Sequence, residues 1–168
     1  MTDLEQKPRL RFKGFTEAWE QRNIGSFFNY YRPDAYIVKS DKYIDDAETP
    51  VLTANKAFIL GYTNENRTFN DPCIIFDDFT LDCKYVDFSF MVKSSAMKIL
   101  TLKDEKNDDL YFSYNLLSSA KIEMLGHARH YISIVQPTSV HSPKFEEQLK
   151  ISSMFKNIDS LITLHQRK

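Results

Sequence analysis

Two aspartates and a lysine near the middle of the chain have a spacing that could support catalysis. Asp71 precedes the triplet Asp82-Cys83-Lys84. In such a pattern two carboxylates can hold a hard cation while the lysine supports an attacking water, which would make the chain a metal-dependent nuclease. Acidic-x-Lys is a short pattern, however, and residues 37–90 contain ten acidic groups. Solvated strand ends are the ordinary explanation, and the nuclease is kept as an alternative.

A zinc site and a methyltransferase site are two further chemistries that the sequence suggests weakly. The candidate zinc ligands are Cys73, Cys83, His127 and His130, but the two cysteines are not closely spaced in the sequence, as they are in structural zinc sites. The stretch NDPC at 70–73 resembles the Asn/Asp-Pro-Pro-aromatic motif of amino-methylating enzymes, yet Cys73 replaces the second proline. The four glycines are too far apart to form the turn that a sulfonium cofactor needs. We therefore predict no catalytic residue and no bound metal.

Basic, imidazole and amide side chains near the ends of predicted strands are the remaining candidates. Such groups can contact phosphates or the edges of bases. The candidates are Asn55, Lys56, Arg67, Lys84, Lys93, His127, Arg129 and His130. Each by itself is explained as well by a solvated surface position. Together they are compatible with a surface that reads a nucleic-acid groove.

The net charge of −1 excludes a strongly basic protein that clamps DNA by charge alone. Any affinity for DNA must come from a local face or from a partner that supplies phosphate contacts. The polar start MTDLEQKPRLRF contains no signal peptide, and no stretch is long enough to span a membrane. With only two cysteines, we expect a cytoplasmic protein.

The elements that would position these residues indicate an α+β fold, a mixed globular domain with an appended amphipathic helix. Residues 16–25 predict a short helix with Thr16 as its cap. Short apolar runs between 36 and 102 predict strands, and the alternation of Val86, Phe88 and Phe90 predicts one buried face. A helix follows from Asn107 to Gly126, and residues 127–137 read as a loop leading to a strand.

The last stretch, residues 142–168, predicts a long helix with an apolar face. Ser142 can cap it, and Pro143 fits its first position. A coiled-coil-type seam then repeats at spacings of 3 and 4 and is widened by two neighbouring residues. The predicted interface consists of Ile151, Met154, Phe155, Ile158, Leu161, Ile162 and His165. Closing its own domain is one role for such a helix, and pairing with another helix is the other.

Four stretches resemble, in the same order, the specificity subunits of type I restriction-modification systems. They are RFKGFTEAWE near the start, TPVLTANKAFILGYTNE and IIFDDFTLDCKYVDFSFMVKSSAMKIL in the middle, and PKFEEQLKISSMFKNIDSLITLHQRK at the end. The resemblance implies a DNA-reading protein that has no catalytic chemistry of its own. In this family a target recognition domain reads one half of a bipartite site in double-stranded DNA.

The resemblance also implies the domains, partners and cofactors. It implies a target recognition domain at residues 1–140 and a conserved spacer or dimerisation helix at 141–168. Helical regions of this family dock methyltransferase subunits, which bind S-adenosylmethionine and methylate adenine, while a separate restriction subunit adds translocation and cleavage. S-adenosylmethionine, Mg²⁺ and ATP are therefore expected on partner subunits and not on this chain.

The usual subunit carries two recognition domains, whereas this sequence carries one, so it resembles half of a subunit. We expect that two copies pair through the terminal helix and read a symmetric site. The helix stops earlier than in the family, which would weaken docking of the methyltransferase. The alternative is a truncated interaction protein that occupies methyltransferase or specificity subunits without productive DNA reading.

Overall fold

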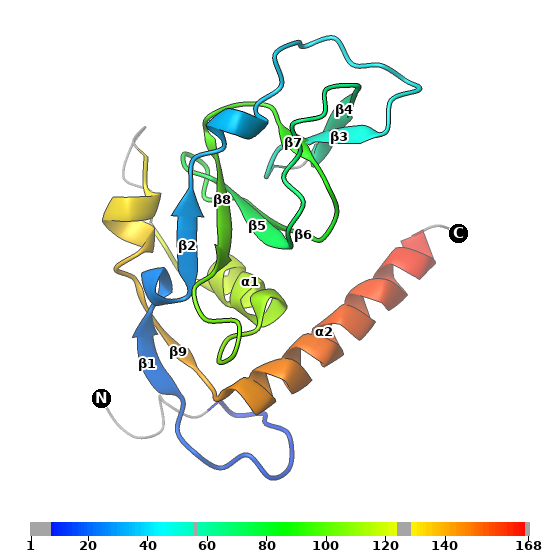
Figure 1. Cartoon of the computed structure of the whole chain (residues 1–168). Coiled ribbons are helices and arrows are strands. Elements are labelled where there is room, and N and C mark those ends of the chain that lie inside the picture. Colours follow the sequence, from blue (N-terminus) through cyan, green and yellow to red (C-terminus); the bar gives the residue numbers. More distant parts are fainter. Residues whose placement is uncertain (1–7, 56, 124–128, 167–168) are drawn as a thin grey trace.

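A four-stranded antiparallel sheet forms the centre of the fold in a computed structural model that describes residues 8–55, 57–123 and 129–166 (Figure 1). Its order is β2 (Phe28–Tyr31), β8 (Met97–Leu102), β5 (Cys73–Asp77) and β6 (Cys83–Val86). All five residues of β5 are buried, because this strand is covered on both faces. Side chains alternate across a strand, so β5 contributes to two separate core layers.

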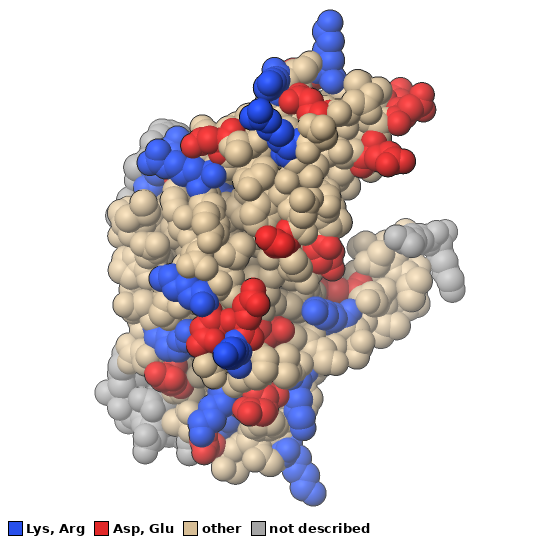
Figure 2. Space-filling model, viewed as in Figure 1, with Lys and Arg blue, Asp and Glu red and all other residues tan. Residues whose placement is uncertain are grey.

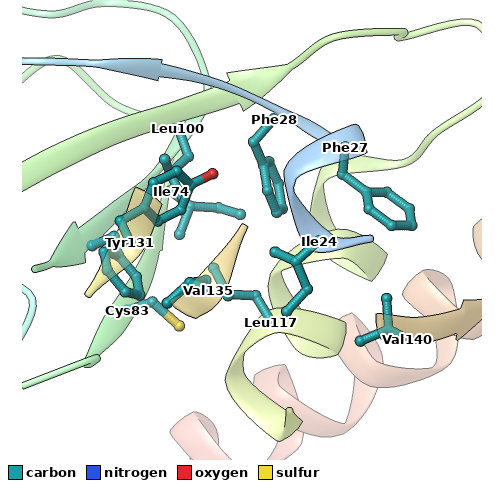
Figure 3. Close-up of a cluster of buried hydrophobic side chains, with 11 residues drawn as sticks. Ile24, Phe27, Phe28, Ile74, Cys83, Leu100, Leu117, Tyr131, Val135 and Val140 are labelled. Carbon is teal, nitrogen blue, oxygen red and sulfur yellow. The ribbon is translucent and has the colours of Figure 1, made fainter. Parts of the chain in front are cut away.

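Helical segments cover one face of this sheet. They are α1 (Leu110–Ser119), η2 (Ile24–Ser26) and a π-helical turn, η4 (Tyr131–Val135). Ile74 and Phe76 of β5 pack there against Leu117 and Tyr131. Figure 3 shows these apolar side chains gathered between the sheet and α1. Full burial of one such side chain contributes about 1.5–3 kcal/mol, so the cluster holds the helical layer on the sheet.

A second, three-stranded sheet covers the other face. Its order is β4 (Ile59–Thr63), β3 (Thr49–Leu52) and β7 (Met91–Val92), and the turn η3 (Asp34–Tyr36) connects β2 to it. Cys73 and Ile75 of β5 pack with Leu52 and Phe90 in this layer. The strands predicted between 36 and 102 are therefore confirmed, and the α+β class is confirmed with them.

The two ends of the domain meet in a small antiparallel ladder. β1 (Glu20–Asn23) pairs with β9 (Ser139–Ser142), so that Glu20 faces Ser142. The helix predicted at 16–25 was therefore wrong, because pairing with a distant strand, as between Gln21 and His141, overrides the local helical signal. The predicted boundary at 140/141 falls inside β9.

The terminal helix, α2 (Phe145–Gln166), starts after β9 and leaves the lower end of the domain (Figure 1). The predicted cap at Ser142 was wrong, because Ser142 is the last residue of β9 and is buried. Within residues 8–55, 57–123 and 129–166, the structure contains no helix that is both long and apolar enough to cross a membrane.

Three other boundaries differ from the sequence predictions. α1 ends at Ser119, and the predicted end at Gly126 lies outside the described residues. The segment 131–135 is helical where a loop and strand were expected. Its carbonyls accept hydrogen bonds from N–H groups later in the chain, as the carbonyl of Tyr131 does from the N–H of Gln136. Phe88 is exposed instead of buried, since β6 ends at Val86.

Candidate functional site

Loops from separate parts of the chain meet at one edge of the fold. β3 and β7 are parallel, so their carboxyl ends reach the same edge, where the backbone N–H of Lys93 donates to the carbonyl of Leu52 at 3.2 Å. Asn55 follows β3 at this edge. The backbone N–H of Ala54 contacts the sulfur of Met97, at the start of β8, at 3.2 Å. The start of β8 therefore joins the same group of loops.

The turn after β5 and the segment that begins at Arg129 complete this group. The backbone N–H of Asp78 donates to the carbonyl of Ala96 at 3.1 Å, and the backbone N–H of His130 donates to the carbonyl of Asp78 at 3.0 Å. We call residues 53–55, 78–82, 93–96 and 129–130 the loop cluster. It lies beside the end of β2, at the upper left in Figure 1.

The loop cluster exposes an arginine beside an aromatic ring. The guanidinium carbon of Arg129 lies 5.7 Å from the centroid of the Phe79 ring, and that ring is 41% exposed. Both groups remain open to solvent, and Asn55 and Ser95 are exposed on neighbouring loops. Arginine can contact phosphates or guanine, amides can contact adenine, and exposed rings can stack on bases. These are the side-chain types that a nucleic-acid surface requires.

A second arginine adjoins the loop cluster. Arg32 directly follows β2 and is exposed. Burial and the charge of Asp78 raise the pKa of Tyr30, while the charges of Arg129 and Arg32 oppose that rise. Both arginines are therefore close enough to Tyr30 for their charges to act on its hydroxyl. Figure 2 shows Lys and Arg side chains gathered at the upper left, over the end of β2. Arg32 and Arg129 therefore expose positive charge at this edge, close to the exposed carboxylates of Asp34 and Asp82, on a chain whose net charge is −1.

Lys93 belongs to this edge but has its charge balanced. Its ammonium pairs with the carboxylate of Asp41 and lies 6.0 Å from the ring centroid of Tyr43. The hydrogen bond that Lys93 donates to Asp41 is the main cause that raises the pKa of Lys93. Lys93 thus contributes less free positive charge than Arg129.

Four other predicted contact residues lie away from the loop cluster or outside the described residues. Arg67 is exposed and follows β4, whose last residue, Thr63, pairs with Thr49. This pair lies at the opposite end of the three-stranded sheet from Asn55. Lys84 is half-buried on the edge strand β6. Lys56 and His127 are outside the described residues.

His130 is the predicted contact residue that the structure contradicts. Its side chain is 0% exposed, and its Nδ1 lies 3.3 Å from the carbonyl oxygen of Asp78. A fully buried imidazole cannot reach a base or a phosphate. His130 lies in the interior because Tyr131, the next residue, enters the core, and the backbone of both residues is bound to Asp78.

Sequence reasoning missed Arg32 and Phe79. Arg32 follows the apolar-aromatic stretch FFNYY, which lies outside the strands predicted from the sequence. The other candidates were chosen because they are polar or basic residues near strand ends. A strand predicted at β2 would have added Arg32 to them on the same ground. Phe79 gave no signal, because an aromatic residue beside an apolar run is more often part of the core.

The described residues do not assemble the nuclease and zinc arrangements that the sequence suggests. Asp82 lies beyond the turn end of β5, whereas Asp71 precedes the other end, and six residue steps along the chain separate positions 71 and 77 by up to about 20 Å. Cys73 and Cys83 pack in different core clusters on opposite faces of the sheet. Among the described residues, no group of three or more His, Cys, Asp or Glu side chains could hold a metal ion.

A second feature of functional interest is the exposed apolar face of α2. Met154, Phe155, Ile158, Leu161 and Ile162 are all exposed, by 37% to 58%. His165 is exposed at the end of the same helix. Leu164, 61% exposed, lies off this face and lines a pocket with Ser160, Tyr85 and Tyr111. Ile151 is half-buried and lines an apolar pocket of about 360 Å³ with Trp19 and Phe12. The predicted seam is therefore open to solvent along most of its length.

Polar contacts fix the start of α2 on the domain. Glu147 is 2% exposed and accepts hydrogen bonds from Arg11 Nε at 2.9 Å and Arg11 Nη2 at 2.6 Å. The side-chain amide of Gln148 donates to Ser142 Oγ at 3.2 Å and to the carbonyl of Pro143 at 3.0 Å. Because such bidentate and buried contacts are directional, they set the direction in which α2 leaves the domain.

The chain is similar to known proteins along most of its length. Residues 16–168 match the family described as type I restriction modification DNA specificity domain. Over 116 residues the chain is 44% identical to the type I restriction enzyme EcoR124I/EcoR124II specificity subunit of Escherichia coli. That stretch is 66% of this chain and 29% of the E. coli protein.

Two solved structures share the fold. The S subunit of a type I restriction-modification system from M. genitalium superposes with a TM-score of 0.67 at 19% identity, covering 95% of this chain and 46% of that one. The HsdS subunit from Thermoanaerobacter tengcongensis superposes with a TM-score of 0.52 at 11% identity, covering 96% and 41%. The chain thus spans less than half the length of each relative named here.

Proposed function

The chain belongs to the type I restriction modification DNA specificity domain family, and we propose that it reads one half of a bipartite DNA site through the loop cluster. In this proposal the chain has no catalytic step of its own. It selects the sequence at which a methyltransferase subunit and, in the full complex, a restriction subunit act.

The observation that carries the proposal is the exposed pair Arg32 and Arg129 beside the loops that hold Asn55 and Phe79. Sequence-specific DNA binding needs cations that contact phosphates and side chains that contact base edges. Loops from both sheets meet here on rigid strands, which allows several side chains to approach one groove together. Two exposed arginines on a near-neutral chain suit a protein whose partners supply the remaining phosphate contacts.

The exposed face of α2 is the proposed docking surface for partner subunits. Water-exposed apolar side chains repeated along one helix favour contact with another helix. We assign residues 1–140 to DNA recognition and 141–168 to this docking role, with methyltransferase subunits or a second copy of the chain as the occupant. S-adenosylmethionine, Mg²⁺ and ATP would bind those partners, and the complex would act on DNA in the cytoplasm.

Methylation mapping tests this function directly. The chain is expressed with the methyltransferase subunit of its own system in cells that lack other specificity subunits, and methylated adenines are located by sequencing. A new, symmetric methylated motif is expected. Arg129→Ala should reduce methylation at that motif, whereas Arg9→Ala, a change of the same type at an exposed position in the N-terminal segment, should not.

The exposed face of α2 also favours the alternative function of an interaction protein. In that case the chain would occupy methyltransferase or full-length specificity subunits without directing them. Expression of the chain in cells with an intact system would then remove existing methylation and create no new motif. Absence of any new motif together with that loss would replace the first proposal by the second.

A further inference from the structure

A buried aspartate connects the separate parts of the loop cluster. Asp78 is 2% exposed and directly follows β5. Its backbone N–H donates to the carbonyl of Ala96 before β8, and its carbonyl accepts from the N–H of His130. Its carboxylate oxygen Oδ1 accepts from the N–H of Tyr131 at 2.9 Å. One residue therefore holds the turn after β5, the start of β8 and the segment that carries Arg129.

The second carboxylate oxygen of Asp78 faces a buried lysine. Oδ2 lies 3.7 Å from the ammonium of Lys98, whose side chain is 0% exposed. Lys98 also donates a hydrogen bond to the carbonyl of Ser95, and Ser95 is an exposed residue of the loop cluster. Burial is the main cause that lowers the pKa of Lys98, and the charge of Asp78 opposes it. Without Asp78 the lysine would be a buried cation that forms no ion pair with the described residues, which is strongly unfavourable.

Such a pair is an unusual way to stabilise a core. A well-packed apolar pair of the same volume is often as stable as a buried salt bridge, so stability alone does not account for Asp78 and Lys98. Their contacts do account for the geometry of the exposed groups. Phe79 is the residue after Asp78, and Arg129 is the residue before His130, so both members of the exposed Arg129–Phe79 contact are attached to Asp78.

We propose that Asp78, with Lys98, is a positioning residue that determines how strictly the loop cluster discriminates between DNA sequences, an inference that rests on the proposed DNA-reading function. Asp78 does not contact DNA, because it is buried. It acts through Arg129, Phe79 and Ser95. The number of cations that face DNA stays the same without it, so overall electrostatic attraction is retained while the alignment of base contacts is lost.

The test compares Asp78→Asn with Asp87→Asn in the full chain expressed with its methyltransferase. Both changes remove one negative charge, but Asp87 is exposed and follows β6 at the end that pairs with Cys73, away from the loop cluster. The readout is the ratio of methylation at the wild-type motif to methylation at motifs with one mismatch. Asp78→Asn should lower this ratio by about tenfold or more, the size of one mismatch penalty. Asp87→Asn should leave it within about twofold.

Binding to a duplex that carries the wild-type motif separates positioning from charge. For Asp78→Asn, the slope of the logarithm of affinity against the logarithm of salt concentration should equal that of the wild type, because that slope counts phosphate contacts. A reduced slope would mean that Asp78 supports DNA contacts in general, and would overturn the proposal. A folded Asp78→Asn chain with the wild-type methylation ratio would also overturn it.

If Asp78→Asn does not fold, the double variant Asp78→Asn with Lys98→Met keeps the test valid, because it removes both buried charges at similar volume. The same loss of discrimination is expected in the folded double variant, and a wild-type ratio there overturns the proposal. Failure of the proposed function has a different signature. In that case the wild-type chain itself gives no methylated motif, whereas failure of this inference leaves the wild-type motif intact.

Discussion

The side-chain oxygen of Gln148 in α2 accepts a hydrogen bond at 2.9 Å from the backbone N–H of Asp109, the residue that caps α1. The carboxylate of Asp109 in turn accepts from the backbone N–H of Phe112 at 2.8 Å and from the hydroxyl of Ser152 in α2. The start of α1 and the first turns of α2 are therefore one connected polar unit. Any complex that depends on the direction of α2 depends on this contact.

Replacement of Gln148 by Ala should lower the free energy of unfolding by about 2–3 kcal/mol, because it leaves buried polar groups without partners. Gln148 is 1% exposed and also donates to the carbonyl of Asn107 at 3.3 Å. Urea denaturation measures the change. Gln166→Ala, at an exposed position of the same helix, is the control and should change stability by less than about 0.5 kcal/mol. Equal effects of the two substitutions would contradict the role given to Gln148.

Charges placed on the exposed face of α2 should prevent partner binding without unfolding the chain. Ile158 and Leu161 are 42% and 58% exposed, so the double variant Ile158→Glu with Leu161→Glu loses little core packing. We expect an unchanged thermal midpoint, together with loss of copurification with the methyltransferase and of any self-association seen by sedimentation. Asn157→Glu, an exposed polar position of the same helix, is the matched control and should bind as the wild type does. Normal assembly of the double variant would show that this face is not the docking surface.

Removal of the charge of Arg32 should change the salt dependence of DNA binding. If Arg32 contacts one phosphate, Arg32→Ala reduces the magnitude of the slope of log affinity against log salt by about 0.9. The preferred motif should stay the same, since a phosphate contact carries no sequence information by itself. Fluorescence anisotropy at several salt concentrations measures the slope. An unchanged slope would place Arg32 outside the DNA interface.

The thiol of Cys83 should be nearly inert in the folded chain. Burial raises its pKa to about 12 from an ordinary value of 9.0. At pH 8 the thiolate fraction then falls from roughly one tenth to one ten-thousandth, so labelling should be about a thousandfold slower than in urea.

The same shift gives a sign for the pH dependence of stability. The folded state favours the protonated thiol, so this contribution is complete below about pH 9 and is lost as the pH rises from 9 towards 12. Urea denaturation between pH 8 and pH 10 should show decreasing stability, and Cys83→Ala should reduce the dependence. Rapid labelling of the native chain at pH 8 would contradict the assigned burial.

The sequence alone determined the class of fold, the strands of both sheets other than β2, and the amphipathic terminal helix, because these follow from local side-chain periodicity. The run CIIFD has the composition of a strand covered on both faces, and the seam from Ile151 to Ile162 has helical spacing. The sequence motifs also indicated the family. What periodicity could not supply was β1, because its pairing with β9 is a contact between distant segments.

The tertiary structure decided which candidate residues act together. His130 looked equivalent to Arg129 in the sequence, yet one side chain is buried and the other exposed, because the backbone of His130 is bound to Asp78 fifty-two residues earlier. Arg32 and Phe79 join Arg129 for the same reason, since their strands end at one edge only after the sheets have formed. A spacing along the chain reports local neighbours, and a surface assembled from distant loops is set by long-range packing and buried hydrogen bonds.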